Sequence, residues 1–185
     1  MKIRRFPMLV LLAAVVHFPA WSADAPAPVP LKTVARDRIL IAGQPSQLDL
    51  EQLRQQGVSS IFNLRTSAEM DDRKQVSYDE AAQAKALAYD YVQEPVGGAD
   101  HPFRPEVLEA FKAQLDRTEG KVLLHCASGG RAGVLYAAYA VKYLGHDPDE
   151  AMRSLEPLGG WPLPLERLTG IALKIERRGE DPAAR

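Results

Sequence analysis

One short stretch of the chain combines residue types that suit nucleophilic chemistry. Residues 122–133 read VLLHCASGGRAG and include Cys126, the only cysteine among the 185 residues. An apolar run ends at this cysteine, a loop of small residues follows, and Arg131 precedes an apolar, helix-like segment. Glycines let a backbone curl with its N–H groups pointing inward, and the amino end of a helix adds positive potential. The pattern predicts a thiolate beneath a cradle for an oxyanion.

The predicted cradle has three kinds of parts: Cys126 as nucleophile, Arg131 as a fixed cation, and backbone N–H groups between them. Those N–H groups belong to Ala127, Ser128, Gly129 and Gly130. A nucleophile under an anion cradle suits covalent transfer of a phosphoryl or a sulfane group. An inert, buried cysteine beside an incidental glycine turn is the alternative. The joint occurrence of strand, His-Cys, glycines, arginine and helix favours the chemical interpretation.

Alternating strand and helix patterns must position this loop. Strands are predicted at 38–44, 58–65, 89–96 and 121–126, and helices at 45–57, 77–88, 104–117, 132–145, 147–159 and 164–178. Such alternation predicts an α/β fold with three layers, α/β/α, around a mostly parallel sheet of four to five strands. Ligands of these folds bind at the carboxyl ends of the strands, and Cys126 lies at one such end.

The amino-terminal segment has the pattern of a secretory signal peptide. Three basic residues precede an apolar run at 8–18, which is too short for a stable membrane anchor, and small residues follow. We therefore expect a signal peptide at 1–23, a Pro/Ala-rich linker at 24–37, one α/β domain at 38–178 and a flexible tail at 179–185. The expected location is the periplasm or the medium, without stable membrane insertion after signal removal; an uncleaved anchor is the alternative.

Charge and histidine spacing narrow the choice of partners. The chain has 23 Lys and Arg against 24 Asp and Glu, a net charge of −1. Without residues 1–23, 20 basic and 24 acidic residues remain, a net charge of −4. A mildly acidic chain does not favour nucleic acid as a partner. The histidines lack the spacing of metal ligands, so we expect no metal and no cofactor.

The cysteine loop resembles the signature of cysteine-dependent phosphatases of the protein-tyrosine and dual-specificity group, His-Cys-x-x-Gly-x-x-Arg followed by Ser or Thr and Gly. His125, Cys126, Gly129, Arg131 and Gly133 match it with one gap. The runs ILIAGQPSQLDLEQLRQQGVSSIFNLR, EPVGGAD and VLLHCASGGRAG together resemble the bacterial beta-lactamase-hydrolase-like family of phosphatase-type domains, over most of the chain between 38 and 145.

This resemblance implies a dual-specificity-phosphatase-like fold and hydrolysis of phosphate monoesters through a phospho-cysteine. The substrate would be a phosphorylated small molecule or protein. Two departures bear on the reaction. Four residues separate Cys126 from Arg131, where the phosphatases have five, and a loop of this length is similar to that of rhodaneses, which move sulfur. Ala132 replaces the hydroxyl residue that helps the phosphatases to expel the thiolate.

Two other functions therefore remain open. The first is a rhodanese-like sulfurtransferase that carries a persulfide on Cys126 and takes sulfur from a sulfane-sulfur donor. The second is an anion-binding module that retains the cradle without turnover, for which Ala132 is the only support.

The resemblance also implies roles for residues outside the loop. His125 would order the loop through hydrogen bonds. Asp100, in the glycine-rich stretch after the third predicted strand, would be the general acid. Its alternative role is to cap the next helix, and Glu94 and His101 are weaker candidates for the acid.

Arg65 ends the second predicted strand, at the same sheet edge as Cys126. It would contact the substrate anion, or else pair with Glu69 as a structural tie.

Overall fold

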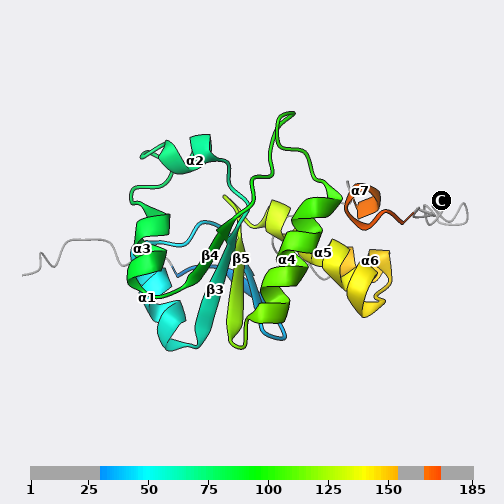
Figure 1. Cartoon of the computed structure of the whole chain (residues 1–185), viewed down its shortest axis with the longest axis horizontal. Helices are drawn as coiled ribbons and strands as arrows, with labels where there is room; N and C mark the ends of the chain where they lie inside the picture. The colour runs from blue at the N-terminus through cyan, green and yellow to red at the C-terminus, as the bar shows by residue number, and fades with distance from the viewer. Residues whose placement is uncertain (1–29, 154–164, 172–185) are drawn as a thin grey trace, which may run out of the picture.

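The computed structural model describes residues 30–153 and 165–171 (Figure 1). Its strands are β1 (Thr33–Arg36), β2 (Ile39–Ala42), β3 (Val58–Asn63), β4 (Asp90–Gln93) and β5 (Lys121–His125). Its helices are α1 (Gln47–Gln55), α2 (Ser67–Asp71), α3 (Glu80–Ala86), α4 (Pro105–Arg117), α5 (Gly130–Leu144), α6 (Pro148–Arg153) and α7 (Leu165–Thr169).

The five strands form one sheet in the order β1-β2-β5-β3-β4. β1 pairs antiparallel with β2, and every other pairing is parallel. The apolar strand β5 therefore lies in the middle, with β2 on one side and β3 on the other. Its central position explains its sequence, because a strand covered on both faces reads as a continuous apolar run. The prediction of a mostly parallel sheet is confirmed, with five strands.

Helices cover both faces of the sheet, which confirms the three-layer arrangement (Figure 1). On one face, α1 and α3 bury Leu50, Leu53 and Ala84 against the sheet. On the other face, α4 and α5 form the larger core, joined by residues of α6 and α7. Phe62 of β3 and Phe111 of α4 meet edge to face there, with ring centroids 5.2 Å apart. Burial of these two apolar faces is the main force that holds the layers together.

Two elements differ from the sequence-based expectations. Residues Thr33–Arg36 of the expected linker form the edge strand β1, so the domain begins before residue 38. Helix α2 follows β3 where no element was predicted. The described parts of α6 and α7 fall within the predicted helices at 147–159 and 164–178. The described structure ends α7 at Thr169, before the predicted end at 178, because Gly170 takes φ of 67° and Ile171 is not helical. Residues 154–164 and 172–178, the expected signal peptide and the expected tail lie outside the described residues.

Within the described part of the chain, none of the helices has the length and apolar character needed to cross a bilayer.

Candidate active site

The loop after β5 folds around the sulfur of Cys126. The cysteine is buried, with 1% of its surface exposed, and the N–H of Gly129 donates to its Sγ at 3.2 Å. Gly129 has φ of 96°, a left-handed conformation that glycine adopts without steric cost. This turn starts α5 at Gly130 and places Arg131 in its first helical turn. The predicted strand, loop and helix are therefore present in the predicted order.

The neighbouring strand end holds the loop in place from behind. The N–H of Gln44 donates to the carbonyl of Ala127 at 3.0 Å. At Gly43, a Cβ atom would lie only 3.0 Å from that same carbonyl oxygen, so a side chain there would displace the loop. Ala127 and Ser128 are exposed at the rim, whereas Ala132 is fully buried in the core beneath it.

Arg131 is oriented by Glu69, a residue of α2. Its Nη2 donates to Oε1 at 2.7 Å and its Nη1 to Oε2 at 2.9 Å, a bidentate ion pair. Nη1 also donates to the backbone carbonyl of Val96. Hydrogen bonding to Glu69 raises the pKa of Arg131, and the nearby charge of the Cys126 sulfur raises it further.

Glu69 stays ionised although it is partly buried. Burial alone would raise the pKa of its carboxyl, but the hydrogen bonds from Arg131 and from the Thr66 N–H and the charge of Arg65 outweigh it and lower the pKa to about 2. The same carboxylate accepts the N–H of Thr66 at 2.9 Å, while the Thr66 hydroxyl accepts the N–H of Glu69 at 3.2 Å. This reciprocal pattern is a capping box, and it fixes where α2 begins.

A buried polar network centred on Glu80 lies behind the loop. His125 Nε2 is 3.0 Å from Glu80 Oε1, and both side chains are fully buried. Asn63 Nδ2 donates to Oε1 at 3.2 Å, and the Gln44 amide donates to Oε2. Burial alone would raise the pKa of Glu80, but the charge of His125 and the hydrogen bonds to the carboxylate outweigh it, so the pKa is lowered. The expected role of His125 in ordering the loop thus involves a partner that the sequence did not indicate.

Arg65 is buried, with 2% of its surface exposed, and its expected contact with a substrate anion is corrected here. Nη1 donates to Gln44 Oε1 at 2.9 Å and Nη2 to Gln75 Oε1 at 2.8 Å. Nε lies 3.6 Å from Glu69 Oε1. A guanidinium enclosed in this way has almost no surface on which to bind a substrate. Arg65 is the structural tie to Glu69, which was its alternative role.

Asp100 lies on an exposed turn, at residues 97–101, whose first residue lies next to Arg131. The turn is closed by Gly97, whose N–H donates to the carbonyl of His101 at 2.7 Å. A Cβ atom on Gly97 would lie 3.0 Å from Arg131 Nη1, so the turn contacts the guanidinium directly. The N-cap of α4 is Arg104, and α4 begins at Pro105, so Asp100 does not cap this helix. The alternative role of Asp100 as a helix cap is therefore wrong.

Glu94, a weaker candidate for the acid, forms an ion pair with Arg104 at 3.4 Å.

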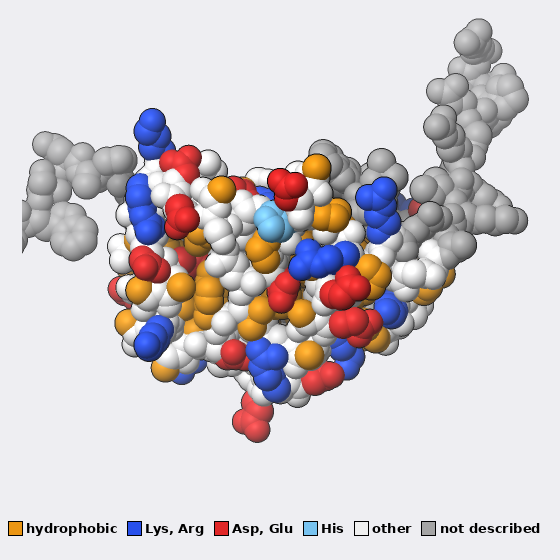
Figure 2. All heavy atoms as spheres, turned by 45° about the horizontal axis from the view of Figure 1, so that its top comes forward, with side chains coloured by type: hydrophobic (Ala, Val, Ile, Leu, Met, Phe, Trp, Pro, Cys, Tyr) orange, Lys and Arg blue, Asp and Glu red, His pale blue; other side chains and the backbone are white. Residues whose placement is uncertain are grey.

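The surface at the carboxyl ends of the strands carries charges of both signs. Figure 2, in which this end of the molecule is turned toward the viewer, shows acidic and basic side chains interspersed around uncharged backbone. An anion would therefore be held by the loop N–H groups and Arg131 at close range, since mixed charges do not attract it from a distance. In the described ranges 30–153 and 165–171, His, Cys, Asp and Glu form no group of three or more that could hold a metal ion.

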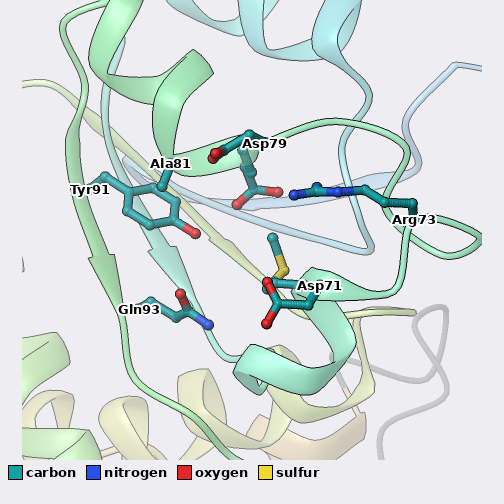
Figure 3. Close-up of a pocket in the computed structure, with 8 residues that line it drawn as sticks. Asp71, Arg73, Asp79, Ala81, Tyr91 and Gln93 are labelled. Atoms are coloured by element: carbon teal, nitrogen blue, oxygen red, sulfur yellow. The ribbon is translucent and has the colours of Figure 1, made fainter.

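A polar cavity of about 130 Å³ is lined by residues of α2, α3 and β4 and includes none of the loop residues. It is lined by Met70, Asp71, Arg73, Asp79, Glu80, Ala81, Tyr91 and Gln93. Figure 3 shows Tyr91 and Gln93 of β4 facing Asp71 and Arg73 across it. Its wall includes Glu80, so the cavity adjoins the buried network behind Cys126.

Comparison with known proteins places these features in a family. Residues 31–141 match the model of the phosphatase-like domain of beta-lactamase hydrolase-like proteins. A beta-lactamase hydrolase-like protein of Xylella fastidiosa Temecula1 is 37% identical over 102 residues, which are 55% of this chain and 23% of that protein. The chain thus matches about a quarter of the length of the curated relative.

Solved structures share the fold. A candidate phosphatase from Shewanella putrefaciens CN-32 is 27% identical, with a TM-score of 0.58 over 76% of this chain and 88% of that chain. The kinase associated phosphatase is 20% identical, with a TM-score of 0.57 over 72% of this chain and 85% of that one. At that identity the second likeness concerns the fold alone, and it agrees with the expected dual-specificity-phosphatase-like architecture.

Proposed function

The chain belongs to the family of beta-lactamase hydrolase-like phosphatase-like domains, and from this premise we propose that it is a cysteine-dependent phosphatase of the protein-tyrosine and dual-specificity type. It hydrolyses phosphate monoesters of a small molecule or a protein. One observation carries the proposal. The sulfur of Cys126 lies at the floor of a loop whose Gly129 N–H points at it, and Arg131 follows this loop in the first turn of α5.

In the first step, the thiolate of Cys126 attacks phosphorus and the bond from phosphorus to the ester oxygen breaks. The loop N–H groups and Arg131 neutralise the charge that develops on the phosphoryl oxygens. Asp100 donates a proton to the departing oxygen. The products of this step are the alcohol and a phospho-cysteine, with Asp100 left as a carboxylate. The support for Asp100 is its position on a turn that contacts Arg131.

In the second step, the Asp100 carboxylate accepts a proton from water, whose oxygen attacks phosphorus. The sulfur–phosphorus bond breaks, and inorganic phosphate and the Cys126 thiolate are released. The hydroxyl that assists this departure in the phosphatases is absent, because Ala132 occupies the position and is buried in the core. Gly129 N–H, which donates to the sulfur, stabilises the departing thiolate instead.

Sulfur transfer is the second candidate, and the short spacing between Cys126 and Arg131 favours it. The Cys126 thiolate would attack the outer sulfur of thiosulfate, the sulfur–sulfur bond would break, and sulfite would leave. The persulfide would then pass its outer sulfur to cyanide, which gives thiocyanate and restores the thiolate. This route needs no general acid, so it assigns no role to Asp100.

A paired assay separates these candidates. Reduced protein is tested for release of phosphate from an aryl phosphate and for transfer of sulfur from thiosulfate to cyanide, with Cys126→Ser as the control. The proposal expects phosphate release that disappears in the control. Thiocyanate formation that depends on Cys126, without phosphate release, would favour the sulfurtransferase. Phosphate binding by calorimetry without either activity would favour the anion-binding module.

We also propose that the protein is exported to the periplasm or the medium. The support is the sequence pattern of residues 1–23, which lie outside the described part. Amino-terminal sequencing of protein recovered from the periplasm should find a chain that starts between residues 23 and 25, after the small residues that follow the apolar run. An intact amino terminus on protein retained in the cytoplasm would contradict export.

A further inference from the structure

We infer that Glu80 is a positioning residue that holds the chain on both sides of Cys126 and so keeps the loop N–H groups directed at its sulfur. The inference deepens the proposed function, on which it rests, because it concerns the same nucleophile. Glu80 is the first residue of α3, far from the loop in sequence, and only 1% of its surface is exposed. Its two carboxylate oxygens reach the loop by separate routes.

The first route goes through His125, which directly precedes the cysteine. Glu80 Oε1 lies 3.0 Å from Nε2 of this ring. In the described part of the chain, the other ring nitrogen, Nδ1, is buried without a hydrogen-bond partner. The carboxylate therefore provides the hydrogen bond that orients the imidazole and fixes a proton on Nε2.

The second route goes through Gln44, which contacts the residue after the cysteine. The Gln44 amide donates to Glu80 Oε2, and the Gln44 backbone N–H donates to the carbonyl of Ala127 at 3.0 Å. Arg65 Nη1 donates to Gln44 Oε1 at 2.9 Å, so the Gln44 side chain is held from both ends. Residues 125 and 127 are thus both fixed by one carboxylate, and the sulfur of Cys126 lies between them.

Charge explains why a carboxylate serves better here than an amide. The groups that hydrogen-bond or lie close to the Glu80 carboxylate are His125 from β5, Asn63 from β3, Tyr91 from β4, and Tyr78 and Gln44 from the adjoining loops. Asp71, Arg73 and Asp79 line the cavity whose wall includes Glu80. Among the groups bonded to the carboxylate, only His125 can carry a positive charge. A buried negative charge is costly unless a cation or several donors compensate it. The charge of Glu80 strengthens the hydrogen bonds that hold His125 and Gln44, and these contacts keep the loop folded with the Gly129 N–H on the Cys126 sulfur.

The test measures the thiolate directly. Ultraviolet absorbance is followed across pH in wild type, Glu80→Gln and Tyr78→Phe, and the Cys126→Ser titration is subtracted as a blank. In Glu80→Gln we expect the thiolate to form about one pH unit higher, a roughly tenfold loss of thiolate at a fixed pH below the midpoint. Tyr78→Phe removes a hydroxyl 3.4 Å from the same carboxylate and leaves the charge in place, so its curve should coincide with wild type.

The His125→Gln background tests whether Glu80 acts through the ring. There, adding Glu80→Gln should cause a smaller shift than it causes in wild type, because only the route through Gln44 remains. A Glu80→Gln curve that superimposes on wild type, or a shift of undiminished size in the His125→Gln background, would overturn the inference. If Glu80→Gln does not fold, Glu80→Asp is used in its place. Aspartate keeps the buried negative charge, but its shorter side chain places the carboxylate farther from His125 and Gln44. Its curve should still move upward, and an unmoved curve would overturn the inference.

This readout needs no substrate, so the two proposals can fail separately. Wild-type protein that shows the Glu80-dependent titration but releases no phosphate would refute the phosphatase while the positioning role stands. Phosphate release that depends on Cys126, with a titration unmoved by Glu80→Gln, would refute only the positioning role.

Discussion

Glu69 holds Arg131 with both of its carboxylate oxygens, at 2.7 Å from Nη2 and 2.9 Å from Nη1. The same carboxylate accepts the backbone N–H of Thr66 and so defines the start of α2. The direction of the cation at the candidate active site is therefore set by a helix of five residues that contributes no buried side chain. Bidentate pairs of this kind fix the plane of a guanidinium as well as its position.

Replacement of Glu69 by Gln should lower kcat/KM for an aryl phosphate about tenfold, because Arg131 would lose its charge-assisted partner and its fixed orientation. Steady-state kinetics measure the change. Asp116→Asn is the matched control, since Asp116 forms an exposed ion pair with Lys112 near the end of α4, which precedes the amino end of β5, whereas the loop follows its carboxyl end. A kcat/KM for Glu69→Gln within twofold of wild type would show that Arg131 does not need Glu69.

The pKa of Glu69 also predicts how stability depends on pH. Folding lowers this pKa from 4.5 to about 2, so the folded state favours the ionised carboxylate. Its contribution to the free energy of unfolding is fully present above pH 4.5 and is lost as pH falls toward about 2. Chemical denaturation between pH 6 and 2 should therefore give a shallower acid loss for Glu69→Gln than for wild type. Parallel curves would contradict this assignment.

Asp100→Asn tests the general acid through the leaving group. With an alkyl phosphate, whose alkoxide needs a proton to depart, kcat/KM, which reports the first step, should fall about 100-fold. With nitrophenyl phosphate, whose leaving group is a stable anion, the fall in kcat/KM should be much smaller. Glu94→Gln serves as the comparison, because Glu94 is engaged with Arg104. An equal effect of Asp100→Asn on both substrates would show that Asp100 does not donate the proton to the leaving group.

Arg65→Lys tests a structural role. The single amino group of lysine cannot replace the Nη1, Nη2 and Nε groups that contact Gln44, Gln75 and Glu69. The substitution therefore leaves buried acceptor oxygens without a hydrogen-bond donor. The free energy of unfolding should fall by about 3 kcal/mol, while KM for an aryl phosphate changes little in the folded fraction. Arg73→Lys, at an exposed position, is the control for the same chemical change. A large rise in KM with an unchanged free energy of unfolding would show that Arg65 binds the substrate and is not a structural residue.

The sequence predicted the structure best where a local residue pattern is compatible with only one kind of element. β5, the glycine turn and α5 could be predicted because a buried parallel strand is continuously apolar and Gly129 must take a positive φ. The spacing from Ser46 to Asp49 matches a capping box, and this box begins α1 in the structure, within the predicted helix at 45–57.

The features that were missed depend on tertiary contacts. β1 is an edge strand of four residues with no buried side chain, so its sequence TVAR shows little beyond the end of a linker. α2 is short and polar, and its one signal is the spacing from Thr66 to Glu69, which matches a capping box. Glu80 falls in a predicted helix, but nothing in the sequence indicates that this carboxylate lies under His125. Such pairings arise only when separate strands and helices come together.

The central claim is that Cys126 carries the phosphoryl group, and isolation of that intermediate tests it most directly. Asp100→Asn protein is mixed with an aryl phosphate, quenched within the first turnovers, digested, and analysed by mass spectrometry. Loss of the base should slow hydrolysis of the intermediate, so the peptide that contains Cys126 should carry one phosphoryl group on sulfur. Turnover of the aryl phosphate by wild type, with Cys126 unmodified in both proteins, would contradict the account.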